Sequence, residues 1–196
     1  MELAQDILLR YKNYAEVSYL DPMRNILRTV TTPQNIQNVF GDIKFVLATE
    51  GNDAEIAWTY TTAGIDFQSK GVSITIDNGV LETLTDGWYL FNVGSTEINI
   101  SEEEAMQIAL NRLDDFSWTT IIDGQFVEVN DYVVLEQPRT VQLLPHSRDE
   151  PLELVPYYYI TFYLNQVYPD NINSIGVGIW ADTGAVRDCQ TLTSEG

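Results

Sequence analysis

Hydrophobic residues recur at helical spacing near the start of each half of the chain. Apolar side chains three and four residues apart form one stripe from Leu3 to Tyr11, which predicts an amphipathic helix. A second helix is predicted after Ser101, because Ser101-Glu102-Glu103-Glu104 has the pattern of a capping box. In that motif Ser101 accepts hydrogen bonds from amides at the helix start and Glu104 reaches back toward it.

Two shorter helices are predicted soon after the first. Asp21-Pro22 interrupts the chain, and one helix is expected over residues 23–28. Thr31-Thr32-Pro33 is typical of another helix start, with proline in the first turn. Ile36, Val39 and Phe40 would then share one face of that helix.

After Gly41 the pattern changes to alternation of period two, which predicts strands. Asp77-Asn78-Gly79 is typical of a tight type I′ hairpin turn, because Asn and Gly tolerate positive φ. The aromatic-rich run 87–93 fits either a strand or a linker. The strands predicted in this half cover residues 43–48, 55–62, 71–76 and 80–85.

The second half continues with aromatic and alternating strands. Asp182-Thr183-Gly184 is predicted to be a turn. Residues 138–156 hold several prolines and charges, which indicates a long loop with at most a short strand. The predicted strands cover residues 126–136, 157–164, 175–181 and 185–192.

The two halves can be laid over each other in the same order of elements. Residues 3–9 match 104–110, and residues 71–80 match 176–185 without a gap. The strand carrying Ile56 and Trp58 corresponds to the one carrying Ile160 and Phe162. The sequence therefore predicts an α+β fold of two tandem repeats, each a helix packed on an antiparallel sheet. The first repeat covers 1–95 with extra N-terminal helices, and the second covers 96–196 with a loop insertion at 138–156.

These shared residues resemble the pattern of the PepSY domain family. That pattern is a helix beginning Ile-Ser and followed by Ala, Ile and Ala, then a strand ending in Asp-x-x-Gly or Asp-x-Gly, with a hydrophobic residue soon after. The second half matches it at Ile100, Ser101, Ala105, Ile108, Ala109, Val177, Ile179, Ala181, Asp182, Thr183, Gly184 and Val186. The first half matches it at Ala4, Ile7, Ile74, Ile76, Asp77, Gly79 and Leu81.

The PepSY resemblance implies a non-enzymatic role outside the cytoplasm. PepSY domains occur in propeptides of secreted metallopeptidases and in cell-envelope proteins, and are thought to inhibit or regulate peptidases. The resemblance thus implies a secreted or membrane-anchored protein whose signal or anchor lies outside this segment. Its partner would be a peptidase or an envelope protein. The alternative in the same setting is a structural spacer, or the ectodomain of an envelope protein.

The charge of the chain limits the classes of partner that it is expected to bind. The formal net charge is −19, which repels nucleic-acid phosphates and anionic lipid headgroups. Such a surface suits a cationic partner, divalent cations or high salt, or serves solubility alone. No apolar stretch reaches the length of a transmembrane helix, and the acidic N-terminus is not typical of a signal peptide. The single cysteine, Cys189, fits a cytosolic protein as well as an exported one.

Enzymatic and metal chemistry have weak support. Asp182-Thr183-Gly184 has the sequence of the active-site turn of aspartic peptidases, and Asp77 stands at the matching place in the first half. Asp-x-Gly is also a common hairpin turn, so this alternative ranks below the non-enzymatic one. Acids such as Asp114, Asp115 and Asp170 could bind calcium but do not follow EF-hand spacing, and are expected to be solvated. We therefore expect no cofactor and no metal.

Tyrosines gather in the predicted strand 157–164 and just after it. A two-faced strand must turn some of them away from its core, and exposed tyrosines are common at binding surfaces. The alternative is that they fill the contact between the two repeats. His146 and Arg148 lie in the predicted loop, where His146 is expected to be exposed. The candidate binding surface comprises Tyr157, Tyr159, Tyr163, Tyr168, His146 and Arg148.

Overall fold

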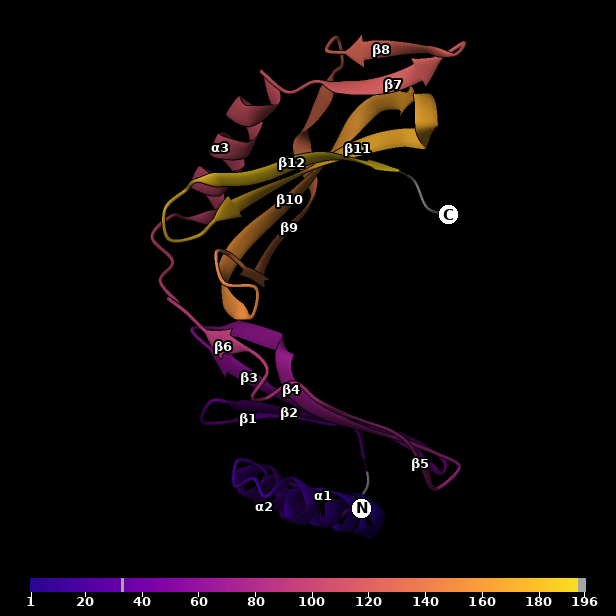
Figure 1. The fold of residues 1–196 in the computed structure, drawn as a ribbon, viewed down its shortest axis with the longest axis vertical. Helices are drawn as coiled ribbons and strands as arrows, with labels where there is room; N and C mark the ends of the chain where they lie inside the picture. Colours follow the sequence, from indigo (N-terminus) through magenta and orange to yellow (C-terminus); the bar gives the residue numbers. More distant parts are fainter. Residues whose placement is uncertain (33, 194–196) are drawn as a thin grey trace. The chain divides into compact units, whose positions relative to one another are not determined.

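The computed structural model describes residues 1–32 and 34–193, and the chain divides into two compact units. Unit 1 is Met1–Asn92 and unit 2 is Val93–Gly196. Within the described residues the fold is mixed, with three α-helices and sheets built mostly from antiparallel strand pairs (Figure 1). None of these helices has the length and apolar character needed to cross a membrane.

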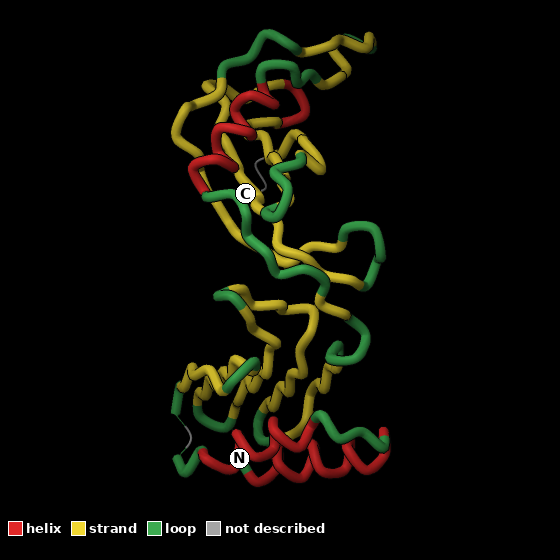
Figure 2. Tube along the Cα trace, turned by 90° about the vertical axis from the view of Figure 1, so that its left-hand side faces the viewer, coloured by secondary structure: helices red, strands yellow, loops and turns green. Residues whose placement is uncertain are grey.

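Unit 1 is a five-stranded meander with two helices on one face. Helices α1 (Glu2–Ala15) and α2 (Leu20–Thr29) lie side by side against one face of the sheet (Figure 2). The sheet has the order β1-β2-β3-β4-β5. Its strands are β1 (Ile36–Phe40), β2 (Ile43–Glu50), β3 (Asp53–Thr62), β4 (Ile65–Asp77) and β5 (Val80–Asp86).

Buried hydrophobic residues alternate with more exposed residues along the strands of unit 1, so the hydrophobic side chains lie on the face that the helices cover. Phe45 on β2, Trp58 on β3 and Ile74 on β4 point to the same side and share a core with Leu8 and Met23 of the helices. The helices are also tied to the sheet by a polar anchor at the end of β5. Tyr11 donates a hydrogen bond of 2.8 Å to Oδ2 of Asp86, and Tyr19 donates to the same oxygen.

Unit 2 places one helix on one face of its main sheet. Helix α3 (Glu102–Leu113) packs against the strand order β12-β11-β10, in which β9 also pairs with β10 (Figure 1). The hairpin β7 (Trp118–Ile122) and β8 (Gln125–Val129) forms a separate two-stranded sheet. The remaining elements are β6 (Asn92–Val93), β9 (Val134–Ser147), β10 (Glu153–Tyr168), the 3-10 turn η1 (Pro169–Asn171), β11 (Ile172–Trp180) and β12 (Val186–Thr193).

The two predictions that rest on a few neighbouring residues, the capping box and the hairpin turn, are confirmed. Both hydrogen bonds of the capping box are present: Glu104 N donates to Ser101 Oγ at 3.2 Å, and Ser101 N donates to Glu104 Oε2 at 2.7 Å. Asp77 pairs with Val80 across a two-residue turn whose Asn78 and Gly79 have φ of 50° and 77°. Unit 1 has two helices and unit 2 an additional hairpin, so these folds do not by themselves establish a tandem repeat.

Two expectations near the N-terminus are wrong. Asp21-Pro22 does not precede α2 but lies in its first turn, where the missing proline N–H has no intrahelical acceptor to lose. The helix expected from Thr31 onward is the strand β1, joined to β2 by a turn at Gly41 with φ of 61°. Its apolar spacing misleads because β1 is an edge strand and leaves Val39 and Phe40 exposed. Pro33, assigned to that helix start, lies outside the described residues.

The loop expected over 138–156 is also wrong, because most of it forms the long hairpin β9–β10. Pro138 and Pro145 are tolerated because β9 lies at the edge of the sheet, where a missing N–H breaks no ladder on the outer side. Only residues 148–152 connect the two strands. The strand expected over 126–136 is interrupted at residues 130–133, between β8 and β9.

Trp58 provides a test of the unit 1 core. It is fully buried, and no hydrogen-bond partner for its Nε1 is found within the described part of the chain. Trp58→Ala is expected to cost about 3–5 kcal/mol of unfolding free energy, because it leaves a large cavity. Trp58→Phe should cost far less, because losing an unpartnered donor offsets the lost ring area. Urea unfolding followed by circular dichroism measures both, and equal losses would contradict this account.

Candidate functional site

The sheet of unit 2 has one face under α3 and one face that we call the open face. Along β10, Tyr158, Ile160 and Phe162 point into the core beneath α3. Tyr157, Tyr159, Thr161 and Tyr163 alternate with them and belong to the open face. The tyrosine-rich strand therefore divides its aromatics between a structural core and a second surface.

Four aromatic side chains of the open face form what we call the ring cluster: His146, Tyr157, Tyr159 and Trp180. Tyr157 is its centre, with ring centroids 4.8 Å from His146, 5.3 Å from Trp180 and 6.1 Å from Tyr159. The strands bring these residues together, because Tyr157 lies opposite Leu144 of β9 on one side and opposite Trp180 of β11 on the other. Tyr157 and Trp180 are buried within the cluster, and Tyr159 is half-buried.

Two glycines of β11 make room for the tyrosine rings. A Cβ built on Gly178 would lie 1.7 Å from the Tyr157 hydroxyl, and one on Gly176 would lie 2.1 Å from the Tyr159 hydroxyl. The rings thus cross β11 and reach β12, where Tyr157 donates a hydrogen bond of 2.8 Å to Oδ1 of Asp188. Burial, and then this carboxylate, raise the pKa of Tyr157. The glycines are needed here for close approach, not for an unusual φ.

An arginine–aspartate pair closes one end of the ring cluster. Arg148 Nη1 donates to Asp182 Oδ2 at 2.8 Å and Nη2 donates to Oδ1 at 2.5 Å, a bidentate arrangement. The guanidinium also lies 4.3 Å from the centroid of Trp180, in a cation–π contact. This pair joins the β9–β10 connection to the β11–β12 turn. The hydrogen bonds from Arg148 lower the pKa of Asp182, although partial burial opposes the shift.

The ion pair at Asp182 disfavours the aspartic-peptidase alternative. An aspartic dyad needs two carboxyl groups that share one proton. Arg148 instead occupies both oxygens of Asp182 and holds it ionised. Asp77 belongs to unit 1, where it ends β4 and accepts a hydrogen bond from the Asn78 side chain. Both aspartates therefore have structural roles at hairpin turns.

The six residues of the predicted binding surface separate into two sets. His146, Arg148, Tyr157 and Tyr159 come together at the ring cluster. His146 is not an exposed loop residue as expected, because it lies on β9 and is half-buried. Tyr157 is likewise buried.

Tyr163 and Tyr168 lie away from the ring cluster. Tyr163 is 37% exposed on the open face, with the Arg139 guanidinium 5.0 Å from its ring centroid. Tyr168 packs edge-on against Trp118, with ring centroids 5.4 Å apart, so it contributes to the core beneath the β7–β8 hairpin. Its role in the fold is structural packing.

The sequence-based prediction missed Trp180, Asp182, Asp188 and Arg139 as members of this surface. One signal was present: Gly176 and Gly178 alternate within a strand, a position where glycine often marks close approach of another group. The Arg148–Asp182 and Tyr157–Asp188 contacts depend on the register of the strands, which could not be predicted from the sequence. Across the described residues, no three His, Cys, Asp or Glu side chains come together as a metal site.

Gly178→Ala tests the close packing of the tyrosine rings. The new methyl group would collide with Tyr157, so we expect a loss of roughly 1–3 kcal/mol in unfolding free energy, with a change in near-UV circular dichroism. In the Tyr157→Ala background the same glycine change should cost less, because the collision with the ring is gone and only the one with the Asp188 carboxylate remains. Gly176→Ala is the matched control and should disturb Tyr159 instead. Additive costs of Tyr157→Ala and Gly178→Ala would contradict the proposed packing.

The pH dependence of the stability of Asp182→Asn tests the ion pair between Arg148 and Asp182. The pKa of Asp182 is lower in the folded chain than its value of about 3.9 in the unfolded chain. Ionised Asp182 therefore contributes its full stabilisation of the fold above the unfolded pKa, and this stabilisation is lost as the pH falls through the folded pKa. At neutral pH the variant should be less stable by roughly 1–3 kcal/mol. Urea unfolding across the acid range should show this gap closing below about pH 4. Asp123→Asn at an exposed turn is the control, and a gap independent of pH would contradict the assignment.

Comparisons with known proteins add little to this site. No family model matches the chain, and no curated protein matches it. Among solved structures, the Bacillus megaterium YpeB C-terminal domain aligns at 15% sequence identity with a TM-score of 0.36. The alignment covers 91% of this chain and 66% of that one, so the chain spans just under two thirds of its length.

Proposed function

We propose that this chain is a non-enzymatic binding protein that presents the open face of unit 2 to a protein partner. The observation that carries the proposal is the composition of that face. Tyr163 and Arg139 are exposed there and Tyr159 is half-buried, and tyrosine and arginine are enriched at the energetic centres of protein interfaces. The buried rings and the ion pair of the ring cluster fix the face from within, so little side-chain freedom would be lost on binding.

The contact residues proposed for the partner are the exposed and half-buried side chains of the open face. Tyr163 and Leu144 are each 37% exposed, and Arg139 is exposed beside Tyr163. Tyr159 is half-buried, and its hydroxyl accepts a hydrogen bond from Gln190 at 3.1 Å. The buried Tyr157 and Trp180 then support this surface from beneath. Binding would use exposed aromatic area around a rigid centre.

We further propose that the two units are tandem PepSY-like repeats. Asp77-Asn78-Gly79 joins β4 to β5, and Asp182-Thr183-Gly184 joins β11 to β12. Trp58 lies opposite Val72, and Ile160 lies opposite Val177. Matching residues 71–80 to 176–185 therefore makes Trp58 equivalent to Ile160. That shifts the sequence-based correspondence by two residues but keeps the same face of each strand.

The proposed role is regulation of a peptidase outside the cytoplasm. The PepSY resemblance of the helix start and the Asp-x-Gly hairpins supports this choice of partner. The mechanism proposed is occlusion, in which the rigid β9–β10 hairpin and the open face block the cleft of the peptidase. A net charge of −19 favours a partner with a basic surface around that cleft.

Inhibition assays test this function. The full chain should lower kcat/KM of at least one member of a panel of purified secreted metallopeptidases. Arg139→Ala combined with Tyr163→Ala should weaken that inhibition by at least about tenfold, because two exposed contacts of the open face are lost. Tyr14→Ala, at a tyrosine that is 88% exposed on unit 1, is the control and should inhibit like wild type.

The two parts of the proposal fail separately. An absence of inhibition across the panel would remove the peptidase role. Inhibition that survives Arg139→Ala with Tyr163→Ala would remove the open face as the contact surface. Fractionation of the producing cell with an antibody against the chain tests the proposed location, and recovery only in the cytosol would contradict it.

A further inference from the structure

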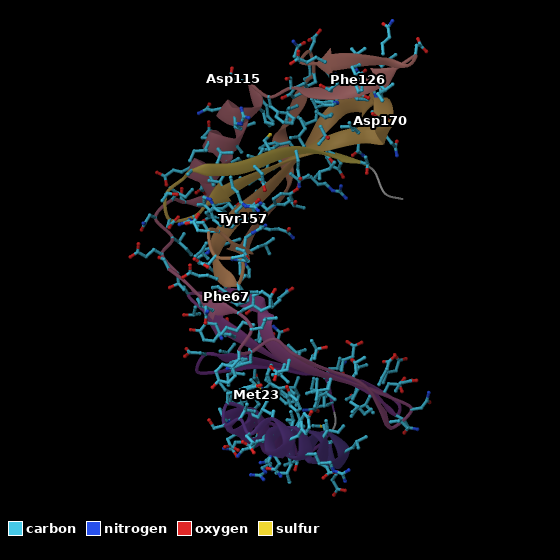
Figure 3. All side chains as sticks on the ribbon, in the orientation of Figure 1. Met23, Phe67, Asp115, Phe126, Tyr157 and Asp170 are labelled. Atoms are coloured by element: carbon cyan, nitrogen blue, oxygen red, sulfur yellow. The ribbon has the colours of Figure 1, made fainter. Side chains whose placement is uncertain are left out.

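The β7–β8 hairpin, which we call the hairpin arm, has two different faces. Trp118 and Thr120 point toward the body of unit 2, where Trp118 packs against Tyr132 and Tyr168, and Thr120 donates a hydrogen bond to Asp170. Ile121 and Phe126 lie directly opposite each other and point the other way. Ile121 is 56% exposed and Phe126 is 81% exposed. The arm thus carries an outward pair of large apolar side chains, of which Phe126 is labelled in Figure 3.

The turn of the hairpin arm fixes where this pair is presented. Asp123 and Gly124 have φ of 52° and 79°, as a type I′ turn requires. The Ile121–Phe126 pair lies just behind this turn, next to the pair Ile122–Gln125. The inward contacts of Trp118 and Thr120 anchor the other end of the arm. The apolar pair is therefore held near the tip of an anchored element, the two-stranded hairpin β7–β8 drawn in Figure 1.

The charge around the hairpin arm has a single sign. The segment 114–131 contains five acidic residues and no lysine or arginine. One of them, Asp123, lies in the turn itself, and Glu128 accepts a hydrogen bond of 2.6 Å from Ser117 beside the outward face. Such a setting repels anionic lipid surfaces and other acidic chains, including a second copy of this one. The acidic residues of this segment are Asp114, Asp115, Asp123, Glu128 and Asp131.

We propose that the hairpin arm is a second interaction surface, which inserts Ile121 and Phe126 into an apolar pocket of a partner protein whose rim is basic. An exposed phenylalanine beside an isoleucine offers a compact anchor of the kind that dominates binding energy. The surrounding carboxylates supply complementarity to the basic rim and speed encounter. This surface is separate in residues from the open face, and the proposal does not depend on peptidase regulation.

Fluorescence anisotropy with a defined peptide tests the proposal on the full chain. The probe is a fluorescein-labelled amphipathic helical peptide of leucine and lysine, which offers an apolar stripe with basic flanks. Ile121→Thr with Phe126→Thr should weaken its binding by at least about tenfold, because both anchors are lost while threonine keeps the strand propensity. Val39→Thr with Val80→Thr is the control. It removes two apolar side chains of unit 1 that are 61% and 67% exposed, and should leave affinity unchanged.

Hydrogen exchange keeps the test independent of folding defects. In the wild-type chain, the leucine–lysine peptide should slow amide exchange within residues 118–129. Peptides of leucine with glutamate, and of serine with lysine, should bind more weakly, because the first lacks the basic flanks and the second lacks the apolar stripe. Unchanged exchange in the hairpin arm, or equal affinity for the leucine–glutamate peptide, would overturn the proposal.

Other occupants would be revealed by two further measurements. Binding to neutral phosphatidylcholine vesicles that depends on Ile121 and Phe126 would make lipid the occupant and overturn a protein partner. A wild-type dimer in sedimentation that Ile121→Thr with Phe126→Thr abolishes would make a second copy the occupant, with the same consequence. Peptide binding that requires both side chains, with neither of these results, supports the proposal.

Discussion

Burial of one face of each antiparallel sheet is the constraint on which the rest of this structure depends. Alternation along a strand gives every second side chain to that face, and a helix must cover it. In unit 1, α1 and α2 cover Phe45, Trp58 and Ile74. In unit 2, α3 covers Ile160 and Phe162. Because side chains alternate between the two faces of a strand, burying these residues in the cores also determines which side chains lie on the opposite faces.

The open face of unit 2 shows how such a remaining surface becomes ordered. Its tyrosines do not extend freely into solvent, because Gly176 and Gly178 let the rings lie flat across β11. Arg148 and Asp182 then join two turns at the end of the same cluster. Stacking, hydrogen bonds and charge pairing all act on a few residues, so the face is rigid before any partner arrives. Rigid aromatic and guanidinium groups are well suited to recognition.

The hairpin arm differs from the open face in how it would bind. The open face offers a broad surface built around buried rings, whereas the arm offers two exposed apolar side chains beside a turn. Both lie in unit 2. In unit 1, Tyr11 and Tyr19 donate hydrogen bonds within the unit, to Asp86. Lys70 likewise donates to the Trp88 and Phe91 carbonyls.

The sequence alone determined the features that depend on neighbouring residues: the capping box at Ser101, the Asn78–Gly79 turn and the alternation of the central strands. It misassigned β1 and the β9–β10 hairpin, because edge strands are half solvated and lose the burial pattern, and because prolines suggest loops until a sheet edge accommodates them. For the candidate site, it supplied His146, Arg148, Tyr157 and Tyr159. Only the tertiary structure joined them to Trp180, Asp182 and Asp188, because those contacts follow from strand register between segments distant in sequence.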